Sequence, residues 1–295
     1  MSTIEVSFAA VAAGLYLEAL AVDDGTVWFG DVIGGGVHRL EPDGSRSSWL
    51  PEKRWFGSMA LNHDGAVLCS GSDGISWFDP SSGRTGTLLS EVDGSPLPGV
   101  NELCPDGRGG LFFGTKDGAA IERAERPRPS ALYHLDAGGT ARQLCDGLVF
   151  TNGIAISPDG GTLYHNETFV GTFAYPLLPD GGLGHPRMLL EKEDCDGMAL
   201  DREGYLWIVG FSSGELLRMT PDGEIVGRIP VPAGAVTNLR FGGADGSDLY
   251  VTSVPLGAGE GLRVGTLPTE PNSVLYRGRS PIAGRVAPRT RFRLQ

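Results

Sequence analysis

The stretch TNGIAISPDGGTLYHNE, from Thr151 to Glu167, decides the fold of this chain. It holds two segments in which apolar and polar residues alternate, and the sequence Ser-Pro-Asp-Gly-Gly separates them. Alternation with a period of two is typical of half-buried strands, and Gly accepts the positive φ that a tight turn needs. The stretch therefore predicts a β-hairpin. Its first strand opens with a polar amide, Asn152, at a place where we expect burial.

Five further stretches of the chain repeat this pattern, and they begin at Leu17, Gly57, Val100, Cys195 and Val236. In each copy an aromatic residue or Leu stands at the centre of the second strand, spaced from the next by 40, 44, 52, 43 and 43 residues. These central residues are Trp28, Leu68, Phe112, Tyr164, Trp207 and Tyr250. Self-similarity at this period indicates repeated supersecondary units.

A second alternating hairpin follows each copy, and the last one, NSVLYRGR from Asn272, is degenerate. Six units that each supply four short strands describe an all-β fold, a six-bladed β-propeller of four-stranded antiparallel blades around a central channel. We expect one propeller domain over residues 1–295, with the segment from Ile4 to Ala10 adding the outer strand of the last blade. A sandwich of two domains is the weaker alternative.

Composition excludes several classes of function. The 295-residue chain has 24 Lys+Arg against 36 Asp+Glu, a net charge of −12, whereas nucleic-acid binding requires clustered basic residues. The four cysteines form no CxxC pair, so a zinc ribbon is not expected. The N-terminus lacks the basic region of a signal peptide, and no window reaches the length of a membrane span. We expect a cytoplasmic protein, monomeric or homodimeric, that acts on a small molecule away from membranes and nucleic acids.

Polar residues recur near the start of the first strand of each repeat. Counted back from the turn glycine they lie at a distance of seven or eight residues, so superposed blades would bring them to one ring at the channel. The ring comprises Glu18, Ser58, Asn101, Asn152, Asp196 and Asn238. Each of them alone could simply cap the entry of its strand through a hydrogen bond to the backbone.

As a set, these side chains indicate a cation site. Carboxylate and amide oxygens are hard ligands, and two carboxylates that converge repel each other unless a cation lies between them. Oxygen-only ligation favours Ca²⁺, Mg²⁺ or Mn²⁺, and the absence of His and Cys from the ring argues against Zn²⁺.

The chain resembles the SMP-30/gluconolactonase/LRE family of calcium-dependent lactonases over nearly its whole length. The resemblance rests on YLEALAVDDGTVWFGD, VNELCPDGRGGLFFGT, TNGIAISPDGGTLYHNET, DGMALDREGYLWIV and TNLRFGGADGSDLYVTS, in the order of the family. It implies that Glu18, Asn152 and Asp196 bind one divalent metal ion. Ca²⁺ is the expected ion, although Zn²⁺ and Mn²⁺ also occupy such sites in the family. It further implies that Asp196 is the catalytic base and that Asn101 lines the channel.

The chain departs from the family pattern where sugar hydroxyls are contacted. Gly99 replaces an Arg, Glu102 replaces an Asp, and the chain reads Lys116 and then Asp-Gly-Ala where sugar lactonases carry Met and a Glu. We therefore expect a lactone less polar than a simple sugar lactone. Glu102, Lys116 and Asn238 complete the predicted substrate contacts, with Lys116 a candidate partner for an anionic group.

The predicted activity is metal-dependent hydrolysis of a cyclic ester. Two alternatives remain: a phosphotriester or aryl ester hydrolase that uses the same metal site, and a non-catalytic propeller that binds a ligand. No GxSxG motif supports a serine hydrolase. The segment GAAIERAERPRPS from Gly118 is predicted to cross the channel mouth, as a lid or as a long connector.

Overall fold

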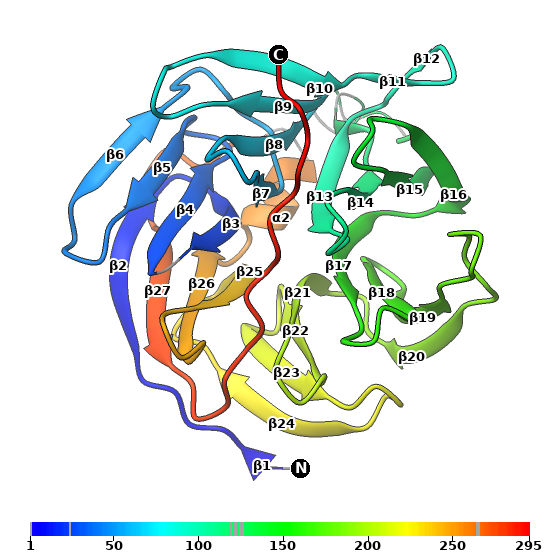
Figure 1. Ribbon diagram of the computed structural model, residues 1–295. Helices are drawn as coiled ribbons and strands as arrows, with labels where there is room; N and C mark the ends of the chain where they lie inside the picture. The colour runs from blue at the N-terminus through cyan, green and yellow to red at the C-terminus, as the bar shows by residue number, and fades with distance from the viewer. Residues whose placement is uncertain are drawn as a thin grey trace.

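A computed structural model describes the chain except for residues 1, 24, 119, 121–122, 124, 126 and 264–265. Within the described part, six four-stranded antiparallel sheets stand as blades around a central axis (Figure 1). The predicted six-bladed β-propeller is confirmed. In five of these blades the strands follow chain order from the axis to the rim, and in the sixth an N-terminal strand lies at the rim.

The first three blades follow chain order from the axis outward. Their strands are β3 (Leu17–Asp23), β4 (Thr26–Asp31), β5 (Val37–Leu40) and β6 (Arg46–Trp49), then β7 (Met59–Leu61), β8 (Val67–Gly71), β9 (Gly74–Phe78) and β10 (Thr85–Leu89), then β13 (Val100–Pro105), β14 (Leu111–Thr115), β15 (Ser130–Leu135) and β16 (Ala141–Leu148). A two-stranded hairpin, β11 (Glu91–Val92) with β12 (Ser95–Pro96), links the second blade to the third.

The next two blades repeat this order. Their strands are β17 (Thr151–Ile156), β18 (Thr162–Glu167), β19 (Gly171–Pro176) and β20 (Arg187–Glu191), then β21 (Cys195–Leu200), β22 (Leu206–Gly210), β23 (Glu215–Met219) and β24 (Ile225–Pro230). The short strand β1 (Ser2–Thr3) pairs in parallel with β24 at the outer edge of the fifth blade.

The sixth blade joins the two ends of the chain. Its inner strands are β25 (Ala235–Gly242), β26 (Asp248–Val254) and β27 (Ser273–Arg279), and its outer strand is the N-terminal β2 (Phe8–Gly14). The predicted closure is confirmed, but the strand runs from Phe8 to Gly14 rather than from Ile4 to Ala10. Ile4 instead continues from β1, and its N–H donates to the carbonyl of Arg228 in the fifth blade.

The repeat signals correspond to real structural roles. All six glycines from which the polar ring was counted have positive φ, between 73° and 105°. The six central aromatic or Leu residues are all buried. Their side chains pack between neighbouring blades, as Trp28 does against Phe78 (centroids 6.0 Å apart) and Trp207 against Phe241 (5.0 Å).

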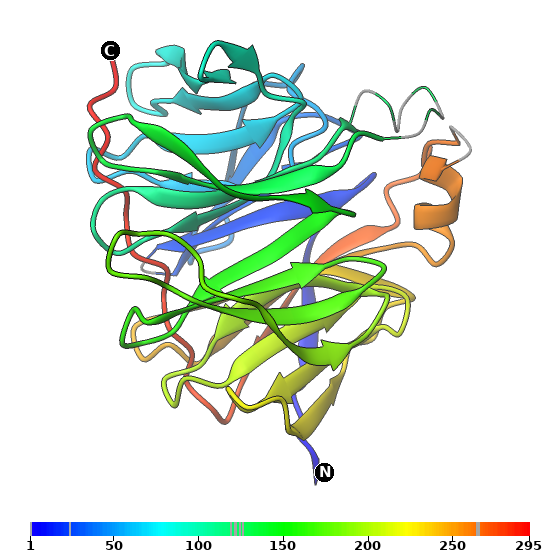
Figure 2. The same ribbon diagram turned by 90° about the vertical axis from the view of Figure 1, so that its right-hand side faces the viewer.

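The two faces of the propeller differ. On one face lies the helix α2 (Ala258–Arg263), and on the other the C-terminal segment crosses the axis (Figures 1 and 2). This segment ties blades together: the N–H of Arg285 donates to Leu200 in the fifth blade, and that of Thr290 to Leu61 in the second. Phe292 is buried in the core between the second and third blades. Among the described residues, no helix has both the length and the apolar character to cross a membrane.

Candidate metal centre and substrate pocket

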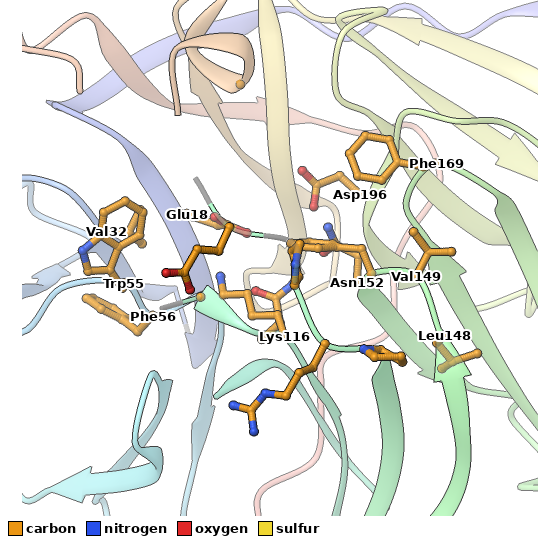
Figure 3. Close-up of a pocket in the computed structure, with 18 of the residues that line it drawn as sticks. Glu18, Val32, Trp55, Phe56, Lys116, Leu148, Val149, Asn152, Phe169 and Asp196 are labelled. Atoms are coloured by element: carbon orange, nitrogen blue, oxygen red, sulfur yellow. The ribbon is translucent and has the colours of Figure 1, made fainter. Parts of the chain in front are cut away.

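A pocket with a volume of about 960 Å³ opens on the face opposite the C-terminal segment. Its polar centre contains Glu18, Asn101, Lys116, Asn152 and Asp196, all predicted from the sequence (Figure 3). The structure therefore brings together residues that lie up to 178 positions apart along the chain.

Four of these residues occupy the same place in their blades. Glu18, Asn101, Asn152 and Asp196 are each the second residue of the innermost strand of a blade. In β13, β17 and β21 the residue itself falls within a register shift, whereas in β3 Glu18 pairs with Gly30 and the shift follows it, before Ala21. A β-bulge leaves one residue unpaired and turns its side chain out of the sheet. Bulges at three of these residues, and one directly after Glu18, accompany the convergence of the four polar side chains on one pocket.

Glycines beside two of these residues let the inner strands approach closely. A Cβ atom on Gly153 would lie 2.6 Å from the backbone nitrogen of Met198, and one on Gly197 would lie 2.6 Å from Oδ1 of Asn238. Real Cβ atoms do not approach this closely, so any side chain would push neighbouring blades apart. In the Asn-Gly and Asp-Gly pairs, the first residue thus supplies a polar side chain, and the glycine lets the inner strands of neighbouring blades approach each other.

Two predicted substrate contacts, Glu102 and Asn238, do not line the pocket. Both are buried, and both accept hydrogen bonds from Arg240, at 2.9 Å to Oε1 of Glu102 and 2.7 Å to Oδ1 of Asn238. Ser58 donates to the same Oε1 at 3.0 Å. Arg240 also lines a smaller cavity of about 360 Å³ under the C-terminal segment. We call Ser58, Glu102, Asn238 and Arg240 the axial network. It stands between the two cavities.

In the sixth blade, the residue at the ring position is one residue earlier in the chain than predicted. In β25 the register shift lies between Val236 and Asn238, as it does between Val100 and Glu102 in β13. The equivalent of Asn101 is therefore Thr237, whose hydroxyl donates to the carbonyl of Leu17 at 2.8 Å. Counting from Gly246 placed the ring on Asn238 because the turn FGGADGSD differs from the other turns.

Burial and mutual repulsion perturb the carboxylates of the pocket. Burial, with a contribution from Glu102, raises the pKa of Glu18 to about 7, although Lys116 opposes the shift. Burial, Glu18 and Glu102 raise the pKa of Asp196 well above its usual range. Both acids are therefore costly to ionise when no cation is present, and a bound cation would favour their charged forms.

Buried oxygens without hydrogen-bond partners make these side chains suitable ligands for a hard cation. Oδ1 of Asp196 and Oδ1 of Asn101 are buried and have no hydrogen-bond partner among the described residues. Leaving such an atom unpaired costs free energy of order 1–3 kcal/mol. A divalent cation held by Glu18, Asn152 and Asp196, with Asn101 beside it, would remove that cost. Within the part of the chain that the structure describes, no three His, Cys, Asp or Glu residues cluster tightly enough to hold a metal by themselves, so a cation here would also need amide oxygens.

Thr168 orients Asn152, a role that sequence reasoning missed. Nδ2 of Asn152 donates to Oγ1 of Thr168 at 3.2 Å, and Thr168 in turn donates to the carbonyl of Cys195 at 2.7 Å. The carbonyl oxygen of Asn152 is thus the atom that remains available to a ligand. Thr168 directly follows the opening hairpin, in the sequence Asn-Glu-Thr, which was the available signal.

Apolar walls, which the sequence did not reveal, flank the polar centre on two sides. Val32, Trp55 and Phe56 lie on one side, and Leu148, Val149 and Phe169 lie on the other (Figure 3). Trp55 and Phe169 have positive φ, 59° and 75°, as does Ala19 next to Glu18. Bulky residues adopt this conformation at a cost of order 1–3 kcal/mol, and such strain clusters at functional sites.

The other side chains of interest differ in their surroundings. Lys116 lies in the pocket, where burial lowers its pKa and Glu18 and Asp196 oppose the shift. The segment from Gly118 lies partly outside the described residues, but Pro127, Arg128 and Pro129 from it line the mouth of the pocket. His165 is fully buried away from the pocket, and burial lowers its pKa to about 3, so it is neutral. All four cysteines are free thiols.

Known proteins share this architecture and sequence. The SMP-30/gluconolactonase/LRE-like region model matches residues 18–255. The 6-deoxy-6-sulfogluconolactonase of Pseudomonas putida is 31% identical over 79% of this chain and 80% of its own. The L-arabinolactonase of Azospirillum brasilense is 31% identical over 77% and 76%. The crystal structure of the calcium-binding protein regucalcin from Agrobacterium tumefaciens superposes with a TM-score of 0.80 over the whole of both chains, at 22% identity. The chain belongs to the SMP-30/gluconolactonase/LRE-like family.

Proposed function

We propose that this protein is a divalent-metal-dependent hydrolase that opens a lactone. The observation that carries the proposal is the meeting of the buried carboxylate of Asp196, the half-buried carboxylate of Glu18 and two amide side chains at the floor of one pocket, with unpaired oxygens on Asp196 and Asn101. The names of two relatives, a sulfogluconolactonase and an arabinolactonase, support lactone hydrolysis as the reaction.

The metal ligands in this proposal are Glu18, Asn152 and Asp196. A divalent cation held there would polarise the lactone carbonyl and stabilise the negative charge that develops on its oxygen. Oxygen donors suit Ca²⁺, and the calcium-binding regucalcin of the same fold supports that choice over Mg²⁺, Mn²⁺ or Zn²⁺.

Asp196 is the proposed general base. Its carboxylate takes a proton from water as the water oxygen bonds to the carbonyl carbon. The ring C–O bond then breaks, and the same proton passes to the departing alkoxide, so the product is a hydroxy acid.

The proposed substrate is less polar than a simple sugar lactone. The pocket of about 960 Å³ lies at the upper end of the range for drug-sized ligands. Three aromatic or aliphatic side chains on each of two walls face the polar centre, and two aromatics are held there with positive φ. An alkyl or aryl substituent on the lactone ring would cover these walls, at about 25 cal/mol for each Å² removed from water.

A lactone panel tests the proposal. The protein is stripped with a chelator and reloaded separately with Ca²⁺, Mg²⁺, Mn²⁺ or Zn²⁺, and acid release is followed by a pH indicator. The panel pairs gluconolactone with γ- and δ-lactones that carry alkyl or aryl groups, and it includes aryl esters and a phosphotriester. We expect metal-dependent turnover with kcat/KM at least tenfold higher for the substituted lactones than for gluconolactone.

Each alternative predicts a different result. Faster turnover of aryl esters or the phosphotriester than of any lactone would replace the proposed substrate. Absence of turnover with every metal, in protein that still binds the metal by calorimetry, would instead support a non-catalytic binding propeller.

A further inference from the structure

Lys116 is the cation of the pocket that lacks a direct partner. Arg128 at the mouth pairs with Asp117 at 2.7 Å, and Arg240 behind the pocket pairs with Glu102 at 2.9 Å. Among the described residues, no carboxylate lies within ion-pair distance of Nζ of Lys116, and no hydrogen bond engages it. Lys116 nevertheless lines the pocket beside Glu18 and Asn152 (Figure 3).

The carboxylates that offset this charge are the ones a metal would take. Glu18 and Asp196 are the two largest favourable electrostatic influences on Lys116. Two carboxylates balance the two charges of a divalent cation, so the loaded centre would leave the ammonium of Lys116 uncompensated. A half-buried cation in that state attracts an anion strongly, because the surroundings screen it poorly.

We propose that Lys116 anchors an anionic substituent of the substrate, such as a carboxylate, sulfonate or phosphate on the lactone, in the metal-loaded pocket. This inference rests on the proposed function and deepens it. The ammonium on the floor fixes the charged group, and the apolar walls take the remainder of the molecule. Metal and anion then bind with positive cooperativity, since each removes charge that disfavours the other, and this coupling is reciprocal.

A non-hydrolysable pair of ligands tests the anchor. The probes are a cyclopentanone with a carboxylate at its β-position and the same ring with a carboxamide, titrated by calorimetry with and without Ca²⁺. Wild type should prefer the carboxylate about 10- to 100-fold when Ca²⁺ is bound, as a charge-assisted hydrogen bond would give, and far less without it. Lys116→Met should lose this preference.

Matched variants isolate the effect of Lys116. Arg128→Gln removes another cation of the same pocket, one already paired with Asp117, and should keep the wild-type preference. Lys116→Gln, with thermal unfolding measured for every variant, guards against misfolding of the Met variant. The anchor is contradicted if both Lys116 variants keep the preference, or if Arg128→Gln loses it equally.

The binding measurement separates this inference from the proposed activity. If the lactone panel shows no turnover but the carboxylate preference depends on Lys116, the anchor stands and the reaction is wrong. If lactones are hydrolysed while carboxylate and carboxamide bind alike, the reaction stands and the anchor is wrong.

Discussion

Two groups of buried polar residues lie along the same axis, and they differ in how their atoms are satisfied. In the axial network, one oxygen of Glu102 accepts from both Ser58 and Arg240, and Asn238 accepts from Arg240. In the pocket floor, Asp196 and Asn101 each keep a buried oxygen with no partner among the described residues. The first group is complete within the protein, whereas the second keeps oxygens that are free to accept a ligand.

The difference separates a structural role from a functional one. Buried polar groups are nearly always hydrogen-bonded in native proteins, so exceptions require an explanation. Asn101 lies at the bulge of β13, whereas Glu102 and Asn238 each follow a bulge by one residue, and this difference of one residue decides which group a side chain joins. Glu102 follows Asn101 directly, yet only Asn101 faces the pocket.

The largest expected effect is loss of turnover in Asp196→Asn. Removing a general base typically costs about 10²- to 10⁴-fold in rate. The metal-free variant should unfold at the same temperature as wild type or higher, because a repelled, buried carboxylate becomes a neutral amide. Asp194→Asn is the matched control: Asp194 lies outside the pocket, where it pairs with Lys192, and should retain activity. Full activity in Asp196→Asn would refute its assigned role.

Arg240→Met should mainly destabilise the fold. Removing one partner of a buried ion pair costs about 3–5 kcal/mol, because Glu102 is left buried and unpaired. The double variant Glu102→Gln/Arg240→Met should recover much of that loss. Chemical unfolding in excess Ca²⁺ measures both. If Arg240→Met is as stable as wild type, the axial network is not a structural element.

Glu18→Gln should abolish stabilisation by Ca²⁺. A ligand at 100 times its Kd stabilises the folded state by about 2.7 kcal/mol, which should raise the Tm of wild type by several degrees. Loss of one of two carboxylate ligands should remove that shift. An equal shift in the variant and wild type would place the ion elsewhere.

The stability of the metal-free protein should depend on pH through the ionisation of Glu18. The pKa of Glu18 is raised, chiefly by burial, from 4.5 to about 7. The protonated acid is therefore favoured in the fold, and its stabilising contribution is full below pH 4.5 and is lost as pH rises through about 7. Metal-free wild type should lose Tm between about pH 5 and 7 more steeply than Glu18→Gln. Parallel profiles would contradict the raised pKa.

The smallest effect is expected for Thr168→Val. Valine keeps the shape of threonine but no longer accepts the hydrogen bond of Asn152, so Asn152 loses its orientation. Groups that orient a metal ligand are typically worth 10- to 100-fold in metal affinity, and we expect about tenfold here by calorimetry with Ca²⁺. Unchanged affinity would show that Asn152 needs no such support.

Most of the fold could be predicted from the repeats, because each hairpin is specified by residues close together in the chain. The turn glycines and the central aromatic residues marked six blades, and the polar strand starts at Glu18, Asn101, Asn152 and Asp196 identified the pocket floor. These features depend on residues only a few positions apart, so the chain displays them directly.

Other features depend on contacts between distant residues, which no local pattern reveals. The pairing of Arg240 with Glu102 spans 138 positions and removes Glu102 from the pocket. The bulge at Thr237 depends on how β25 pairs with β26. The aromatic walls come from Trp55 and Phe169 in connections between strands, where no periodicity marks them.

We propose above all that Glu18, Asn152 and Asp196 share one cation. Crystals grown with Mn²⁺, measured near its absorption edge, would locate the ion by its anomalous signal. We predict one strong peak at the pocket floor in contact with oxygens of all three residues. A peak elsewhere, or a floor in which these side chains hold only water at saturating Mn²⁺, would contradict a shared cation site.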